Sequence, residues 1–361
     1  MGQGKKVIKV MAVIVLGLFM ASCSADYWNP TKWFDSNDSD SSESADDAVE
    51  ATSTYSVALG GVARGRDELV VYDDEENVVD FSDHSLTFET NNDNIVLVVR
   101  EGFDDYMSGS GARISPQKVG TTIIRYFVDG VEGEDRYKVI VPPQSLIQIL
   151  MGEAIGQIYS EAQVADWSVG LSSDSPTGNA LAYVVKNRVD LIDAGQPFSL
   201  FIVDENVWDS NSPASHWDAV ITAESSGTYQ FSPVDPENES NKLYLASASR
   251  DNFTQNEYLV AYDQTVLTAA KIFGIDAADP TNGAFAFRTP TAGQTECLAE
   301  TLKLGLAYLP YECGPGDESY PAFKPVQVLI HPSIALLSDG RPSFVFYRNR
   351  AEDEPAVTNA P

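Results

Sequence analysis

A glutamate within the apolar face of a predicted helix is the residue of this sequence best suited to acid–base chemistry. The spacing of apolar residues predicts a helix from 145 to about 163. At about 100° per residue, Glu153 projects between Ile149 and Leu150, toward the core. A carboxylate there loses hydration, so its pKa should rise toward the range that suits a general acid. In the alternative interpretation, Glu153 lies at the edge of the apolar face, where its carboxylate contacts water or Arg188.

The elements that position this glutamate are expected to be mainly helices. Helical spacing predicts three of them, over residues 145 to about 163, 176–188 and about 256–273. Ser145 is the expected N-cap of the first helix, and Gln148 completes a capping box three residues later. Ser175 and Pro176 are the expected N-cap and first residue of the second helix. A later segment, residues 343–348, is bounded like a strand.

The part of the chain before these helices has the pattern of β-structure. Short runs of β-branched and aromatic residues, separated by Asp, Asn and Gly, predict strands at residues 69–72, 94–100, 121–127 and 137–141. Their length and spacing favour a small antiparallel sandwich over about residues 55–142. This segment shows no catalytic combination of residues, so we expect it to act as a spacer or a binding module.

The sequence is strongly acidic, with 53 acidic and 23 basic residues and a formal net charge of −30. Proteins that bind the phosphates of nucleic acid need a basic surface, which this composition does not supply. Nucleic acid is therefore not an expected partner. The acidity is interpreted as a property of a soluble surface.

The histidine and serine patterns exclude several other kinds of active site. His84, His216 and His331 are widely separated, and the sequence has no His-Glu-x-x-His run, so no zinc site is expected. The Gly-x-Ser-x-Gly turn of many serine hydrolases is also absent. We therefore expect neither a metal nor another cofactor.

The N-terminus has the pattern of an export signal. A basic start is followed by an apolar run over residues 10–21, too short to span a bilayer comfortably. The run ends in Met-Ala-Ser-Cys, which resembles the lipobox of bacterial lipoproteins, in which the cysteine carries lipid. This resemblance implies a signal peptide over residues 1–22, lipid on Cys23 and, because Ser24 follows, a location at the outer membrane facing the periplasm. The alternative is an ordinary cleaved signal with an incidental cysteine.

Two further segments are expected to lack a stable fold. Residues 23–54 are rich in Ser, Asp and Glu and predict an acidic, disordered tether. Residues 351–361 predict an acidic tail that frays.

The other two cysteines form a natural pair. If Cys23 carries lipid, Cys297 and Cys313 remain in an oxidising compartment, which favours a disulfide between them. The alternative is two buried free thiols. A cysteine nucleophile is not expected in this arrangement.

Several short segments follow one another in the helical half in a defined order. They are residues 150–154, 180–189, 229–232 and 279–287, with 344–347 near the end. By their order and joint presence, about residues 146–349 resemble the SleB-like cell wall hydrolase family, which includes spore-cortex-lytic enzymes. Residues 119–141 resemble the last two strands of bacterial Ig-like domains. The two resemblances imply a multidomain chain, in which an all-β, Ig-like sandwich precedes a mainly α (α+β), lysozyme-like catalytic domain over residues 145–350.

The family resemblance implies a specific reaction. Glu153 would be the catalytic acid of a lytic transglycosylase or muramidase that cuts the bond between N-acetylmuramic acid and N-acetylglucosamine in peptidoglycan. A hydrolysing glycosidase normally uses two carboxylates, whereas a transglycosylase uses the 6-hydroxyl of the sugar as its nucleophile. One glutamate can then donate a proton and later take one back. The sequence places no second carboxylate near Glu153, which agrees with the single-acid mechanism.

Other matched positions are expected to have supporting roles. Asn187 and Arg188 would brace the active-site helix by hydrogen bonds. An ion pair between Arg188 and Glu153 would instead lower the pKa of the glutamate and argue against its role as an acid. The expected substrate contacts are Tyr229, Gln230, Phe231, Ala284 and Phe285. For Phe231, a core position is the alternative.

Two other functions are alternatives at this point. Apparent insertions at residues 166–177 and 204–214 depart from the family pattern and bear on substrate preference. The two alternative functions are a non-catalytic surface lipoprotein that binds the cell wall, and an N-acetylmuramoyl-L-alanine amidase. A site without activity would tolerate Leu or Ala in place of Glu153, so the retained carboxylate favours the catalytic interpretation.

Overall fold

The computed structural model describes a large part of the chain. The described residues are 53–62, 68–70, 84–99, 111–162, 175–195, 203–225, 227–274, 278–281, 283–288, 308–309, 326–329 and 344–349. All of them belong to one compact unit, Glu50–Pro361. The predicted signal peptide, the acidic tail, Cys23, Cys297 and Cys313 lie outside these residues. Of the predicted tether, only residues 53 and 54 are described, and they begin a strand instead.

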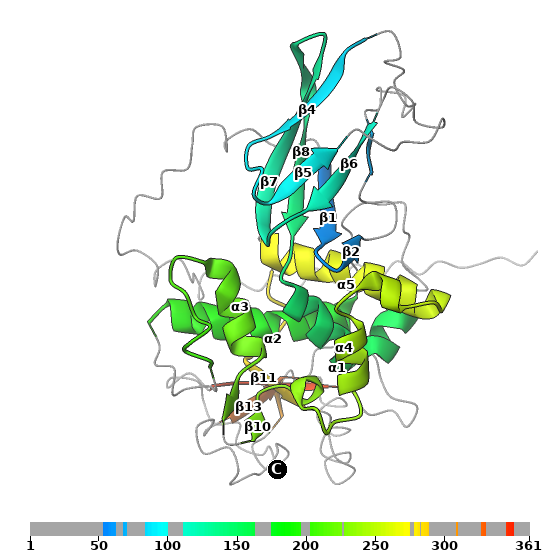
Figure 1. The fold of residues 1–361 in the computed structure, drawn as a ribbon. Coiled ribbons are helices and arrows are strands. Elements are labelled where there is room, and N and C mark those ends of the chain that lie inside the picture. Colours follow the sequence, from blue (N-terminus) through cyan, green and yellow to red (C-terminus); the bar gives the residue numbers. More distant parts are fainter. Residues whose placement is uncertain are drawn as a thin grey trace, which may run out of the picture. The chain divides into compact units, whose positions relative to one another are not determined.

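The described strands of the first half form two sheets (Figure 1). The first sheet has the order β2 (Gly61–Val62), β1 (Ser53–Ala58), β8 (Val131–Val141), β7 (Gly120–Val128) and β4 (Leu86–Thr90). Strand β1 pairs in parallel with β8, and the other neighbours are antiparallel. The second sheet has the antiparallel order β3 (Glu68–Val70), β6 (Gly111–Pro116) and β5 (Val96–Val99). The four predicted strands are confirmed as β3, β5, β7 and β8.

Side chains from both sheets share one hydrophobic cluster. Ile124 and Tyr126 of β7 alternate with more exposed residues, as expected for a strand with one face in a core. Leu86 of β4 and Ile114 of β6 belong to the same cluster. The strands β1, β2, β4 and β6 were not predicted, and the sandwich and its Ig-like character stay predictions.

The described residues of the second half form five α-helices and several shorter elements. The helices are α1 (Gln144–Ala162), α2 (Pro176–Asp193), α3 (Pro213–Ile221), α4 (Asn241–Ala246) and α5 (Asn256–Gly274). The 3₁₀ turns are η4 (Ser232–Val234) and η5 (Arg250–Asn252), and a small hairpin joins β9 (Glu224–Ser225) to β10 (Thr228–Tyr229). The three predicted helices are confirmed as α1, α2 and α5, whereas α3 and α4 were not predicted. Ser175 caps α2 as expected, because its hydroxyl accepts the N–H of Gly178 over 3.0 Å.

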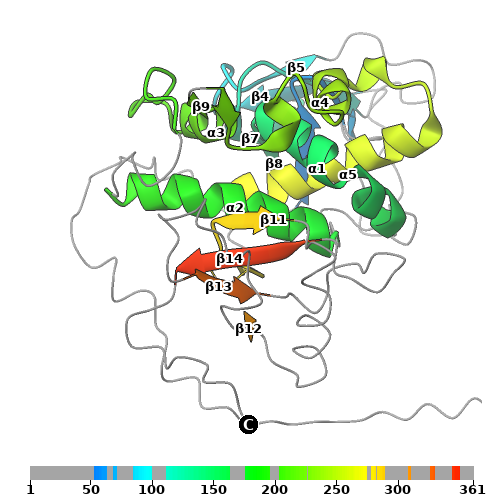
Figure 2. The same cartoon turned by 90° about the horizontal axis from the view of Figure 1, so that it is seen from below.

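A four-stranded antiparallel sheet completes this mixed α/β region. Its order is β11 (Ala286–Arg288), β14 (Val345–Asn349), β13 (Val326–Leu329) and β12 (Tyr308–Leu309). Strand β11 contacts α2, and Figure 2 shows the sheet beside that helix. The strand predicted at residues 343–348 is confirmed as β14. The resemblance to a lysozyme-like fold stays a prediction.

Helix α1 packs against α2, α3, α4 and α5. Its buried residues are Leu146, Ile147, Ile149, Leu150, Met151, Ala154 and Ile158. At about 100° per residue they span roughly 200° of the helix circumference, a wide apolar face. A helix with so wide an apolar face is typically enclosed by several neighbours. The position of each α1 side chain is therefore fixed by packing from several directions.

The predicted N-cap of α1 is wrong. The first helical hydrogen bonds are accepted by the carbonyl of Pro143, so the helix begins before Ser145. The buried Ser145 side chain lies close to the carboxylate of Asp218 in α3 instead. Gln148 donates from Nε2 to the carbonyl of Tyr244 over 3.0 Å. The capping box therefore does not form, because the helix begins before Ser145 and a tertiary partner binds the Gln148 side chain.

Hydrogen bonds cross the predicted domain boundary at residues 142–145. The side chain of Gln144 accepts the N–H of Gly60 over 3.0 Å and donates to the carbonyl of Ser247 over 2.8 Å. Arg250 forms a two-point ion pair with the buried carboxylate of Asp263, with distances of 2.7 and 3.0 Å. Its backbone N–H donates to the carbonyl of Gly60 over 2.6 Å. The β1–β2 turn is thus joined directly to the helices.

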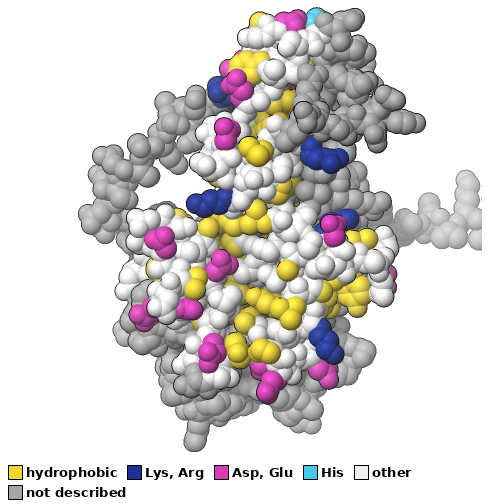
Figure 3. All heavy atoms as spheres, viewed as in Figure 1, with side chains coloured by type: hydrophobic (Ala, Val, Ile, Leu, Met, Phe, Trp, Pro, Cys, Tyr) yellow, Lys and Arg dark blue, Asp and Glu magenta, His cyan; other side chains and the backbone are white. Residues whose placement is uncertain are grey.

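Two surface properties are relevant to partners. None of the described helices is long and apolar enough to cross a membrane. On the face drawn in Figure 3, Lys and Arg side chains lie singly and do not gather into one patch.

Candidate active site

Glu153 lies at a kink in α1. Ala154, the next residue, has φ −133° and ψ 19°, values outside the helical range. On the other side, Gly152 faces turn η4, where a Cβ at position 152 would lie 2.5 Å from the Cβ of Pro233. The glycine therefore allows η4 to approach the backbone of α1 directly beside the glutamate.

Turn η4 brings a serine hydroxyl to the carboxylate. Ser232 donates from Oγ to Oε1 of Glu153 over 3.1 Å. The turn is held by the buried side chain of Asn241 in α4, which donates to the carbonyl of Pro233 over 2.9 Å. Because these partners come from packed elements, the direction of the Glu153 carboxylate is fixed.

Burial raises the pKa of the half-buried Glu153 from its ordinary 4.5 to about 7. Hydrogen bonds from the side chain and backbone of Ser232 act in the opposite direction and lower it. A carboxyl group with a pKa near 7 can both give and take a proton at neutral pH. A paired cation would lower this pKa, so the direction of the shift argues against the ion pair with Arg188 that the sequence left open.

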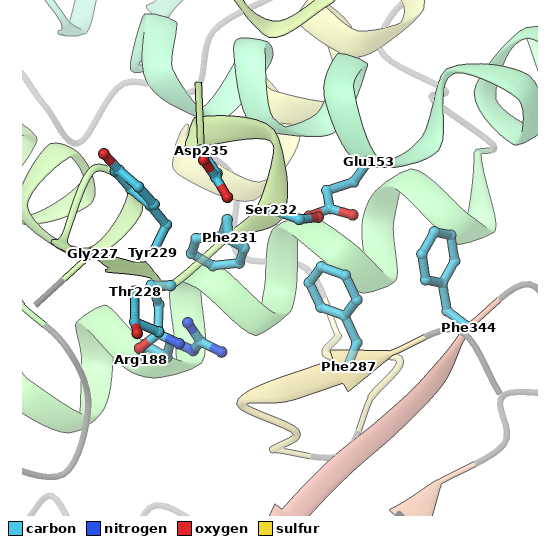
Figure 4. Close-up of a pocket in the computed structure, with 11 residues that line it drawn as sticks. Glu153, Arg188, Gly227, Thr228, Tyr229, Phe231, Ser232, Asp235, Phe287 and Phe344 are labelled. Atoms are coloured by element: carbon cyan, nitrogen blue, oxygen red, sulfur yellow. The ribbon is translucent and has the colours of Figure 1, made fainter. Parts of the chain in front are cut away.

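The carboxylate opens into a cavity of about 470 Å³ (Figure 4). The described residues that line it are Glu153, Arg188, Gly227, Thr228, Tyr229, Gln230, Phe231, Ser232, Asp235, Phe287 and Phe344. Its volume lies in the usual range for small-ligand sites. One wall comes from β10 and η4 and is largely polar. The other is aromatic, because Phe287 of β11 and Phe344 meet edge to face with their ring centroids 5.5 Å apart.

Arg188 supports the cavity from α2. Its guanidinium lies 4.7 Å from the centroid of the Phe231 ring, close enough for a cation–π contact. Its Nε donates to the carbonyl of Phe285. The buried Arg188 thereby links the Phe231 ring to the residue directly before β11, the strand that carries Phe287 of the aromatic wall.

Asn187 fixes the neighbouring segment. Its Nδ2 lies 2.8 Å from the carbonyl of Ala284, 3.0 Å from Oδ2 of Asp279 and 3.3 Å from the hydroxyl of Thr281. Gly283 has a φ of 82°, which favours glycine, and its N–H donates to Oδ2 of Asp279 over 2.7 Å. Asn187 and Arg188 thus brace the segment before β11, whereas the sequence suggested that they brace α1.

The structure brings some of the predicted substrate contacts together and leaves others apart. Tyr229, Gln230 and Phe231 line the cavity with Glu153. Ala284 and Phe285 are buried, and neither is among the described residues that line it. The side chain of Phe285 precedes strand β11 and packs against Ile192 of α2. The substrate role predicted for these two residues therefore has no cavity contact to support it.

Sequence reasoning missed four important residues of the cavity. Ser232, Phe287 and Phe344 belong to the segments compared with the family, but no role was assigned to them. Asp235 follows η4, outside those segments, and lines the same cavity as Glu153, so the cavity has a second carboxylate that the sequence did not reveal. Only the fold brings Asp235 to this cavity.

Within the described part of the chain, no group of three or more His, Cys, Asp and Glu side chains is placed to hold a metal ion. Comparisons with protein-family models, curated proteins and solved structures gave no match to this chain. The likeness to SleB-like hydrolases thus rests on the sequence segments alone.

Proposed function

We propose that this protein cleaves the glycan strands of peptidoglycan, as a lytic transglycosylase or muramidase with Glu153 as its general acid and base. One observation carries the proposal. A carboxyl group whose pKa is raised to about 7 lies on the wall of an open cavity with polar and aromatic sides. The resemblance of the ordered sequence segments to SleB-like enzymes supports the substrate class.

The chemistry requires one group that changes its protonation state twice. Protonated Glu153 gives its proton to the glycosidic oxygen between N-acetylmuramic acid and N-acetylglucosamine, and the bond from that oxygen to C1 breaks. The 6-hydroxyl of the same muramic acid then attacks C1 and gives its proton to the Glu153 carboxylate. The product is a 1,6-anhydro end, and the acid is restored. A pKa near 7 suits both transfers at neutral pH.

The cavity walls suit a sugar chain. The amide of Gln230 can exchange hydrogen bonds with an N-acetyl group, and the rings of Tyr229, Phe287 and Phe344 offer flat apolar faces to sugar rings. Aromatic side chains supply much contact area at low cost in side-chain entropy, which favours binding of a flexible polymer.

The proposed location agrees with the proposed substrate. A lipid on Cys23 would hold the protein at the outer membrane, facing the periplasm, where the tether lets the folded part reach nearby cell wall. This element of the proposal rests on the lipobox-like sequence.

Digestion of purified sacculi, followed by mass spectrometry, tests the proposal. We expect anhydro-muropeptides from the wild-type protein and a loss of at least about 100-fold in their formation by Glu153→Gln. Glu257→Gln is the matched control, because it makes the same change at an exposed glutamate in the first turn of α5. Equal cleavage by the wild type and Glu153→Gln would overturn the role of Glu153.

The products also separate the other functions. Released stem peptides with intact glycan strands would indicate an N-acetylmuramoyl-L-alanine amidase. Sacculi that bind the protein and stay uncut would indicate a non-catalytic wall-binding lipoprotein.

A further inference from the structure

The cavity contains a second carboxylate close in the chain to the partner of the first. Asp235 lines the cavity three residues after Ser232, the residue that bonds Glu153. The N–H of Asp235 donates to the carbonyl of Ser232 over 3.2 Å, so one backbone turn connects the two positions. Figure 4 shows Ser232 between Asp235 and Glu153. The same short turn thus places both acids.

The two oxygens of the Asp235 carboxylate have different surroundings. Oδ1 accepts the backbone N–H of Glu237 over 2.9 Å, which fixes the side chain. Among the described residues, no donor lies within hydrogen-bond distance of Oδ2. Since the half-buried side chain lines the cavity, Oδ2 is available to a ligand or a water molecule there.

The cavity brings the two acids to one space. Glu153 and Asp235 both line a volume of about 470 Å³, which is in the usual range for small-ligand sites. Paired carboxylates of glycosidases act at separations of about 5 to 10 Å, and the longer part of this range leaves room for a water molecule. An acid and a base that line one cavity can act on two sides of one bond, and Asp235 is the second carboxylate among the described residues that line this cavity.

We propose that Asp235 is a general base that activates water, so that the enzyme hydrolyses a fraction of the glycan bonds it cleaves. This inference rests on the function proposed above and adds a second outcome at the same site. It concerns which nucleophile reaches C1 after the bond has been protonated.

The hydrolytic step balances in atoms and protons. Glu153 gives its proton to the leaving oxygen, and the bond between that oxygen and C1 breaks. The water oxygen bonds to C1 while its proton passes to Asp235. One water is thereby added across the bond, and the new reducing end carries the water oxygen. Asp235 then releases its proton to solvent, and Glu153 regains one.

Digestion of sacculi in H₂¹⁸O separates the two outcomes. Water attack places ¹⁸O at a reducing end, whereas attack by the 6-hydroxyl gives an unlabelled anhydro end. Immediate borohydride reduction prevents loss of the label by exchange. The proteins to compare are the wild type, Asp235→Asn and Glu239→Gln. The asparagine keeps an oxygen for the N–H of Glu237, and Glu239 is an exposed acid in the same segment that is not among the described lining residues.

We expect Asp235→Asn to lower the yield of labelled reducing ends by roughly 100-fold, while anhydro ends change by no more than about 3-fold. Glu239→Gln should leave both products unchanged. A parallel fall of both products in Asp235→Asn, or unchanged labelled ends, would overturn the role of Asp235. Wild-type protein that forms only anhydro ends would also overturn it, yet would support the proposed function. Failure of the wild type to cut any glycan bond would instead remove the proposed function itself.

Discussion

The hydroxyl of Ser232 donates to the carboxylate of Glu153 over 3.1 Å, in surroundings that favour the neutral form of that carboxyl group. The two influences on the glutamate oppose each other. Burial raises the pKa, whereas the hydrogen bonds from Ser232 stabilise the charged form and lower it. The resulting pKa of about 7 is a balance, so Ser232 helps to set the pH at which Glu153 keeps its proton.

Ser232→Ala tests this balance. Removal of the hydroxyl leaves the carboxylate less stabilised, so the pKa of Glu153 rises. Because the first step needs the protonated acid, the alkaline limb of the pH–activity profile should move upward by roughly 0.5 to 1 pH unit. Ser232→Thr keeps the hydroxyl and should keep the profile of the wild type. An alkaline limb that stays in place in Ser232→Ala would show that the hydroxyl does not influence the acid.

Glu153 also links stability to pH. Its folded pKa of about 7 exceeds the ordinary value of 4.5, so the folded state binds this proton more tightly than the unfolded state. The contribution to stability is full below about pH 4.5 and is lost as the pH rises through 7. Glu153→Gln is neutral throughout and should raise the free energy of unfolding by roughly 1 to 3 kcal/mol at pH 8. The difference from the wild type should vanish near pH 4.

Urea denaturation of both proteins from pH 4 to pH 8 measures this dependence. Glu257→Gln, at an exposed position, provides the comparison. If Glu153→Gln is no more stable than the wild type at pH 8, the carboxylate is not destabilised by its surroundings.

Gly152→Ala should separate Ser232 from Glu153. A Cβ at this position would lie 2.5 Å from the Cβ of Pro233, so turn η4 has to move away from α1. Overpacking of this kind costs about 1 to 3 kcal/mol, and a displacement near 1 Å at an active site lowers kcat by about 100-fold. Thermal unfolding and the rate of sacculus digestion measure the two effects.

A second change can show that the clash is the cause. Pro233→Gly removes the atoms that the new methyl group would meet, so the double variant should recover part of the lost activity. A double variant no more active than Gly152→Ala would point to a different effect of the alanine.

Asn187 and Lys186 are neighbours with very different expected effects. Asn187→Ala removes the amide that holds the segment before β11, which should cost about 1 to 3 kcal/mol and raise the KM for glycan strands. Lys186 forms only a largely exposed pair with Asp190, so Lys186→Gln should change stability by less than about 0.5 kcal/mol. Denaturant titrations of the two variants test the contrast, and equal losses would contradict it.

Features that depend on neighbouring residues could be predicted from the sequence. Ser175 and Pro176 determine the start of α2 locally, and the structure has the helix there. Glu153 was found because a carboxylate among apolar residues at helical spacing is visible in the sequence itself. The expected rise in its pKa was correct in direction, and burial is its largest cause.

Features that depend on distant partners could not be predicted. Ser145 and Gln148 have the residue types of a capping box, but Gln148 bonds to α4 and Ser145 is buried close to Asp218 of α3. The sequence did not reveal either of these helices. Asp235 is one acid among many in a chain with 53 acidic residues, so its type carried no signal. Its position depends on how turn η4 sits against α1, and this becomes known only in three dimensions.

The enclosure of α1 by four other helices has a consequence for how this protein could diversify. The helix that carries the acid offers little freedom for sequence change, since a substitution on almost any side disturbs a neighbour. By contrast, the cavity walls come from the β10–η4 segment and from the residues around β11 and β14. Changes in what the cavity accepts are therefore expected in these peripheral segments, while α1 stays as it is.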